Sequence, residues 1–301
     1  MTDTAIPGPE NQARAVWRQF RAHRGALFGL VVLGLLVLAV VIGPWLWQAE
    51  ALKVSEAIKL KNQSPGGRFP LGTDQLGRDM LARMMAAGKV SLAVGFVAML
   101  IALTFGTLIG VLAGYFKRLD GPLMRLTDVF LSLPLIPLLL VMVMLFRDSI
   151  AKYLGPELGA FILIVFAIGI TSWMQAARVV RGEVLALKER EYVLAARSIG
   201  APPRRIILRH ILPNVVSPVM VAATLGIAEA IITESVLSFL GLGFPPDFPT
   251  WGRLLYDGLS YMQLYPERVI WPGMAISLTV LSVNYIGDGL RDALDPRIRG
   301  R

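Results

Sequence analysis

Long runs of apolar residues dominate this chain, and six of them contain no Asp, Glu, Lys or Arg. A helix of about 20 apolar residues crosses the hydrocarbon core of a bilayer. Because the runs are continuously apolar and do not alternate every second residue, they favour helices over the strands of a membrane β-barrel. The chain is therefore predicted to be an all-α integral membrane protein with six transmembrane helices. The predicted spans are 27–47, 90–116, 129–146, 158–177, 211–228 (extending past Glu229) and 269–287.

The composition agrees with this prediction. Hydrophobic residues make up 55% of the chain and charged residues 17%, whereas about 25% of the residues of an average soluble domain are charged. The first apolar run is followed by no small-residue cleavage site, so we expect it to be retained as a span. The absence of cysteine excludes disulfides and thiolate metal sites.

Lysine and arginine are distributed unevenly between the two sides of the predicted membrane. If the N-terminus is cytoplasmic, the inner segments hold 19 of the 30 basic residues and the outer segments hold 11. Loops rich in Lys and Arg remain in the cytoplasm. We therefore expect an N-in, C-in orientation, which places the segment between the fourth and fifth spans in the cytoplasm.

Four arginines near the N-terminus lie three or four residues apart and so share one face of a helix. Val16 and Phe20 fall on another face. This pattern predicts an interfacial helix on the inner membrane surface, and a solvated tail with ordinary positive charge is the alternative. The arginines are Arg14, Arg18, Arg21 and Arg24.

The spans divide the chain into four parts. They are a cytoplasmic N-terminal tail with the interfacial helix (1–25), the first span with an outer loop (26–89), a five-helix core that contains a loop at 178–213 (90–289), and a cytoplasmic tail (290–301). In the outer loop, Asp74 is expected to cap a short helix that runs through Met85.

Two spans carry residues that predict how the helices pack. Gly106, Gly110 and Gly114 recur every fourth residue of the second span, and such a face lets another helix approach closely. Close packing is a better explanation for them than a pore lining. Pro134 and Pro137 in the third span predict a kink.

Enzymatic chemistry is not evident in this sequence. It has two histidines, no HExxH metal motif, no G-x-S-x-G elbow and no phosphate-binding G-x-x-x-x-G-K-[ST] loop. We therefore expect no catalytic residue, no metal site and no nucleic-acid partner, and any ATP is expected to act on a separate subunit.

Ionisable or amide side chains inside spans are the candidates for a transport pathway, because they are costly in a bilayer. Glu229 and Glu234 in the fifth span are five residues apart, about 140° around a helix. Glu234 is expected near the outer end, within reach of water, and either a substrate contact or a structural hydrogen bond explains it. Asn284 in the sixth span either lines the pathway or, as we favour, bonds another helix.

The loop at 178–213 is too long and too regular for a simple connection. High helical propensity continues to Ile199, and Gly200 then provides a position that tolerates positive φ. Pro202 blocks continuation of the helix. Two short helices joined at this bend are predicted to form a projecting knob, and small residues keep its surface able to enter a groove. Those small residues are Ala195, Ala196 and Ala201.

This loop resembles the cytoplasmic "EAA" loop of ABC-importer permeases, which docks into ATPase subunits. The residues that match the motif are Ala195, Ala196, Gly200, Leu212 and Pro213. Leu194 stands where the motif has Glu, and His210 where it usually has Ile.

Other stretches are similar to segments of the peptide- and nickel-type permeases. They are "FPLGTDQLGRDMLARMMAAGKVSLAVG", "SFLGLGFPPDFPTWGRLL" and "GDGLRDALDPR". The N-terminal "WRQFRAHRGALFGLVVLGLLVLAVV" resembles the leader and first span of the second, C-type permease of dipeptide and oligopeptide importers.

The resemblance implies a subunit of a heteromeric importer in the bacterial inner membrane. Its expected partners are a second homologous permease, two ABC ATPases that hold ATP and Mg²⁺, and an external substrate-binding protein. The residues implied to contact the ATPases are Leu194, Ala195, Ala196, Gly200, Ala201 and Pro202. The alternatives are a self-sufficient channel or proton-coupled carrier that uses Glu229 and Glu234, or a membrane scaffold.

Overall fold

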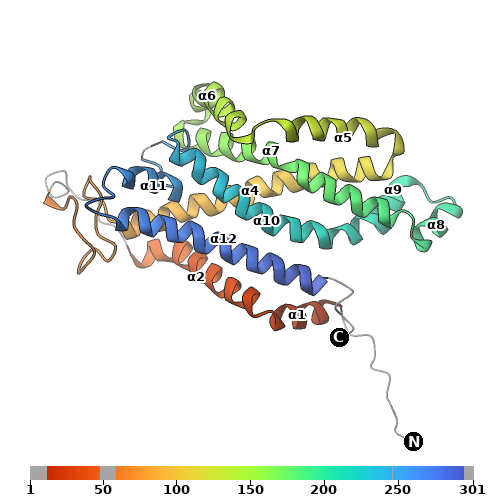
Figure 1. Cartoon of the computed structure of the whole chain (residues 1–301), viewed down its shortest axis with the longest axis horizontal. Coiled ribbons are helices and arrows are strands. Elements are labelled where there is room, and N and C mark those ends of the chain that lie inside the picture. Colours follow the sequence, from red (N-terminus) through yellow and green to blue (C-terminus); the bar gives the residue numbers. More distant parts are fainter. Residues whose placement is uncertain (1–11, 48–58, 246, 295–301) are drawn as a thin grey trace, which may run out of the picture.

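The computed structural model describes residues 12–47, 59–245 and 247–294, and in this part of the chain every regular element is a helix. The long helices other than α6 lie side by side along roughly one axis, the short α8 and α9 project at one end, and α11 lies near the other (Figure 1). The elements are α1 (Gln12–Ala22), α2 (Arg24–Leu46), α4 (Met80–Tyr115), α5 (Lys117–Ser132), α6 (Leu135–Leu154), α7 (Pro156–Leu187), α8 (Glu191–Ser198), α9 (Pro203–Ile206), the π-helix η1 (Ile207–Ile211), α10 (Leu212–Phe239), α11 (Trp251–Leu259) and α12 (Glu267–Leu294).

Five of the six predicted spans correspond to single helical stretches that are long and apolar enough to cross a membrane. These stretches are longer than the apolar runs, because charged residues at the ends of a run do not stop a helix. The second stretch, for example, runs for 36 residues from Met80 to Tyr115, about 54 Å at the rise of an α-helix.

The third predicted span, 129–146, is not one continuous helix. It is divided between α5 and α6, whose axes differ by 86°. Pro134 has no backbone N–H, and the residue before a proline avoids the helical region. Leu133 accordingly adopts an extended conformation, with φ −76° and ψ 135°. The predicted kink is therefore a full break in the helix.

The predicted cap at Asp74 is wrong, because α4 begins at Met80 and Asp79 caps it. The Asp79 carboxylate accepts hydrogen bonds from the backbone N–H groups of Leu81 and Ala82. Asp74 instead closes a turn in the preceding loop, where it accepts the N–H groups of Leu76 and Arg78. Each aspartate accepts hydrogen bonds from backbone N–H groups two to four residues later in the chain. The sequence alone therefore does not tell which of the two caps the helix.

The glycine face of the second span lies against α7. A Cβ added to Gly106 would lie 2.6 Å from the Ala176 Cβ, and one added to Gly110 would lie 2.6 Å from the Ala177 carbonyl oxygen. Gly114 is equally close to Val184, with 2.7 Å between the added Cβ and the valine Cβ. The missing side chains thus let the two backbones touch over two helical turns.

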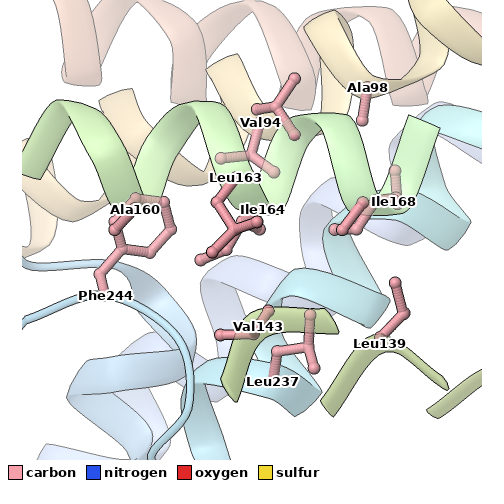
Figure 2. Packing of buried hydrophobic residues seen from close by; sticks show 13 residues of the cluster. Val94, Ala98, Leu139, Val143, Ala160, Leu163, Ile164, Ile168, Leu237 and Phe244 are labelled. Atoms are coloured by element: carbon pink, nitrogen blue, oxygen red, sulfur yellow. The ribbon is translucent and has the colours of Figure 1, made fainter. Parts of the chain in front are cut away.

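The largest hydrophobic cluster lies between α4, α6, α7 and α10. Figure 2 shows side chains from these helices and from the loop after α10 pointing toward one another. The labelled members are Val94, Ala98, Leu139, Val143, Ala160, Leu163, Ile164, Ile168, Leu237 and Phe244.

The N-terminal helix α1 packs on α12. Phe20 is buried together with Ala26 and Ala293, and the His23 ring caps α2 by accepting the Ala26 N–H at 2.9 Å. Trp17 is 53% exposed, as an interfacial helix requires. The placement of α1 on a membrane surface stays a prediction, and the Arg14 side chain lies outside the described residues.

The glycine contact generates a stability prediction. Gly110→Ala places a methyl group in contact with the α7 backbone, and such overpacking costs about 1–3 kcal/mol. Alanine is the better helix former by about 1 kcal/mol, so a helix without this contact gains stability from the same change. We expect the apparent melting temperature of the purified protein in detergent to fall.

Gly34→Ala is the matched control, because a Cβ added at Gly34 meets no atom within 4 Å. We expect its melting temperature to stay the same or rise. A Gly110→Ala protein that melts at or above the native temperature contradicts the backbone contact.

Candidate functional site

The bend of the knob is a regular helix-ending motif. We use "knob" for residues 191–206, which comprise α8, the turn and α9. The Gly200 N–H donates to the Arg197 carbonyl at 3.0 Å, and the Ala201 N–H donates to the Ala196 carbonyl at 3.1 Å. This pair of bonds is the Schellman motif, and Gly200 has the positive φ of 79° that it requires. Pro202 then extends the chain before α9 begins.

One side of the knob is anchored in the bundle and the other is exposed. Val193 and Ala196 are buried with Val180 and Val184 of α7. Ala196 therefore does not belong to the exposed small surface that the sequence predicts, because the helix turns it inward, toward Ile206. On the outer side, Ala195 and Pro202 are exposed and Ala201 is half-buried. Leu194 is 40% exposed and Ile199 85% exposed.

The knob continues into α10 without a loop. Helix α9 leads into η1, and η1 leads directly into α10. Short π-helical segments occur often at functional sites. Here Asn214 donates its side-chain N–H to the backbone carbonyl of His210, in the last turn of η1, at 2.7 Å. A displacement of the knob is therefore transmitted to α10 by continuous helix and to α7 by packing.

A cavity of about 760 Å³ lies between α7 and α10. Its residues recur every three or four positions on both helices, so each helix contributes one face. The lining residues are Met99, Ser172, Gln175, Ala176, Val179, Glu183, Asn214, Ser217, Pro218, Val221, Ala222, Leu225, Gly226, Glu229, Arg291 and Leu294. The cavity thus extends from Glu229 to the end of the bundle where the knob lies, the knob end.

The two glutamates of the fifth span lie on different sides of α10. Glu229 is exposed and lines the cavity. It stands ten residues before Phe239, the last residue of α10, which is about 15 Å along the helix axis.

Glu234 is fully buried, with 0% exposure, so the expectation that water reaches it is wrong. Its carboxylate accepts hydrogen bonds from Ser91 on α4 at 3.0 Å and from Ser238 at 2.7 Å. The Trp251 N–H donates to the same Ser91 hydroxyl at 3.2 Å. Glu234 therefore joins α4, α10 and the start of α11. Of the two explanations for this residue, a substrate contact or a structural hydrogen bond, the structure supports the structural hydrogen bond.

The remaining candidate, Asn284, is half-buried on α12 and is not among the residues that line the cavity. Sequence reasoning missed Ser172, Gln175 and Glu183, which line the cavity from α7. Their spacing along one face of α7 is a signal in the sequence, but Ser172 and Gln175 are uncharged and do not interrupt the apolar pattern, and Glu183 lies beyond the predicted fourth span.

Two ion pairs fasten α5 to α7 near the knob end. Arg181 donates to Asp120 through two nitrogens, one of them at 2.8 Å, and Arg178 donates to Asp128. The hydrogen bond from Arg181 and its charge hold the pKa of the Asp120 carboxyl below its ordinary value.

At the opposite end, Asp74 holds the outer loop to the bundle. Burial raises the pKa of the Asp74 carboxyl, but hydrogen bonds from Arg78 and the charges of Arg78 and Arg83 outweigh it and leave the pKa below its ordinary value. Asp74 accepts from both arginine side chains at 2.7 Å. Arg83 also lies 3.6 Å from Asp257 of α11.

Family comparisons assign most of the chain. Residues 106–300 match the family described as "Binding-protein-dependent transport system inner membrane component". Residues 11–65 match the "N-terminal TM domain of oligopeptide transport permease C".

Similar proteins include the dipeptide transport system permease protein DppC of Alkalihalophilus pseudofirmus, with 38% identity over 97% of this chain and 94% of the relative. The oligopeptide transport system permease protein OppC of Haemophilus influenzae is 36% identical over 96% and 91% of the two chains. The glutathione transport system permease protein GsiD of Pectobacterium atrosepticum is 39% identical over 95% and 91%.

Among solved structures, a chain of the MetNI methionine ABC transporter in an inward-facing conformation superimposes with a TM-score of 0.56. The match covers 69% of this chain and 94% of that one at 20% identity. At this identity the match supports the fold alone.

Loss of the Asp74 charge tests the outer-loop network. Asp74→Asn leaves the buried Arg83 without its nearest carboxylate, and breaking such a pair typically costs about 3–5 kcal/mol. We expect a clear fall in melting temperature. The pKa of Asp74 is lowered on folding. The contribution of the ionised Asp74 to the free energy of unfolding is therefore fully present above the ordinary pKa of an aspartate, and it is lost as the pH falls through the lowered pKa.

Asp247→Asn serves as its control, because the Asp247 side chain is 92% exposed and lies 3.8 Å from Arg78. Such a surface pair contributes little to stability. Equal melting temperatures for the two variants contradict the structural role of Asp74.

The cavity is tested by thiol accessibility in this cysteine-free chain. In membranes, Ser217→Cys is expected to react with a water-soluble maleimide because Ser217 lines the cavity. Ser91→Cys is the buried control, with 0% exposure, and is expected to react at least about tenfold more slowly. Equal rates contradict the cavity.

Proposed function

The chain belongs to the family of binding-protein-dependent transport system inner membrane components, and from this premise we propose that it is a permease subunit of an ABC importer that moves short peptides, or a related small solute, into the cytoplasm. The names of three relatives, which concern dipeptides, oligopeptides and glutathione, support the choice of solute.

The proposed complex has several subunits in the bacterial inner membrane. A second homologous permease completes the pathway, two ABC ATPases bind ATP and Mg²⁺, and an external binding protein delivers the solute. The chain needs no cofactor and catalyses no reaction of its own. In the proposed N-in, C-in orientation the knob end is cytoplasmic, where ATPases are available.

The observation that carries the proposal is the connection of the knob to both walls of the cavity. Helix α9 runs through η1 into α10, and Val193 and Ala196 pack on α7. The same two helices line the cavity. A force applied to the knob by a closing ATPase dimer therefore acts on the helices that define access to the pathway.

The exposed side of the knob fits a protein partner. Leu194 and Ile199 of the knob are 40% and 85% exposed, and Leu208 of the adjoining η1 is 53% exposed, although all three lie outside the predicted apolar core of the membrane. Leu194 replaces the glutamate of the family motif, so an apolar contact takes the place of an ion pair at that position.

The alternative of a proton-coupled carrier that uses both glutamates receives no support. Glu234 is sealed between α4 and α10 by hydroxyl groups, whereas Glu229 lines the cavity. The two carboxylates therefore do not form one proton path.

Substitution of Ile199 tests the coupling role. Ile199→Glu leaves the fold intact because the side chain is 85% exposed, but it places a charge in the proposed contact with the ATPase. We expect substrate-stimulated ATP hydrolysis and uptake by the reconstituted complex to fall at least about tenfold, an effect of the size found at interface hot spots.

Ile199→Met keeps the apolar contact and is the control, with near-native activity expected. Gly200→Ala tests the bend separately from the contact with the ATPase. A Cβ added at Gly200 meets nothing within 4 Å, so the substitution disfavours only the positive φ that the bend requires. Native coupling in Ile199→Glu with an unchanged amount of assembled complex overturns the docking role.

A further inference from the structure

Glu229 stands where two cavities meet. A second cavity, of about 200 Å³, lies beside the larger one and is lined mainly by α5, α6 and α7. Three polar residues line both cavities: Ser172, Gln175 and Glu229. The side chains of Gln175 and Glu229 are exposed and that of Ser172 is half-buried, so a solute in either cavity reaches the same polar group.

No basic side chain of the cavity linings lies beside the Glu229 carboxylate. The lining of the smaller cavity contains no Lys or Arg among the described residues, and that of the larger one contains Arg291. Arg291 lies in the last turn of α12, at the knob end with Asn214. Glu229 is fifteen residues beyond Asn214 on α10, about 22 Å along the axis.

The donor set does not suit a metal ion. Within the described part of the chain, no three His, Cys, Asp or Glu side chains gather as a metal site requires. The group that surrounds the junction consists of one carboxylate, one amide carbonyl and one hydroxyl. All three accept hydrogen bonds, and an ammonium group has three N–H donors and a positive charge.

We propose that Glu229, with Gln175 and Ser172, forms a subsite for the ammonium group of the transported solute, which for a short peptide is its α-amino group. This inference rests on the proposed function and deepens it. A carboxylate inside a membrane span is costly and is therefore a candidate for a functional role. Among the three residues that line both cavities, Glu229 is the one with a charged side chain. Glu229 is thus a specificity-determining residue that favours free amines over blocked ones.

The second glutamate of α10 is not available to this subsite, because it is fully buried. Glu234 is closed off by Ser91 and Ser238, which leaves Glu229 as the single carboxylate at the cavity junction.

The test uses a single cysteine in this chain within the complete complex, without ATP or binding protein. Val179→Cys is the reporter, because Val179 lines the larger cavity and is 42% exposed but is not one of the three polar residues. Maleimide labelling of this chain is followed with increasing trialanine or N-acetyl-trialanine. We expect trialanine to slow labelling and the acetylated peptide to do so only at about ten- to a hundredfold higher concentration, the loss typical of a charged hydrogen bond.

Three variants complete the experiment. Glu229→Gln is expected to remove the advantage of trialanine, Glu229→Asp to keep part of it, and Glu183→Gln, a carboxylate at the knob end of the same cavity, to keep all of it. Equal protection by the two peptides, or an advantage that survives Glu229→Gln, overturns the subsite. Dissociation of the complex in Glu229→Gln also overturns it, because the carboxylate then pairs with another subunit.

The two proposals fail separately. Substrate-stimulated ATP hydrolysis is measured on the same preparations with the binding protein present. A complex that couples ATP hydrolysis to the knob but shows no preference for the free amine refutes the ammonium subsite alone. A complex in which the preference holds but the knob variants remain coupled refutes the docking role alone.

Discussion

The close contact between α4 and α7 is the constraint on which the rest of the structure depends. Gly106, Gly110 and Gly114 let the two backbones meet, and the ion pairs of Arg178 and Arg181 with α5 add to the hold on α7. Val180 and Val184, which meet Gly110 and Gly114, also belong to the buried cluster that contains Val193 and Ala196 of the knob. Gln175, on the same helix, lines the cavity. In a membrane, where helices gain little from the hydrophobic effect, close packing of this kind is what defines a scaffold.

On this scaffold, α10 has a different character. It begins at the π-helix that joins it to the knob, contains Pro218, and presents Glu229 to the cavity and Glu234 to α4. One end of the helix is therefore connected to the knob, which we propose contacts the ATPases, and the other end is fastened by the hydroxyl groups of Ser91 and Ser238. A helix that is held at one end and driven at the other converts a displacement of the knob into a change in the cavity between α7 and α10.

Much of this arrangement could be predicted from the sequence, because it follows from local rules. Hydropathy locates the spans, the spacing of small residues identifies the glycine face, and Gly200 with Pro202 predicts the bend. What could not be predicted depends on distant partners. The burial of Glu234 requires Ser91, which is 143 residues away, and the inward position of Ala196 depends on α7. The 86° break at Leu133 and Pro134 also exceeds the kink that a proline by itself indicates, since neighbouring helices set the angle.

The central claim is that the state of the ATPases reaches the cavity through the knob. The most direct test is the rate of maleimide labelling of Val179→Cys in the complete complex, compared between the nucleotide-free state and the state trapped with ATP and vanadate. The account predicts that trapping changes this rate severalfold when the knob is native and leaves it unchanged when Ile199→Glu is also present. A change of equal size in both complexes would contradict the account, because the signal would then reach α7 and α10 by another route.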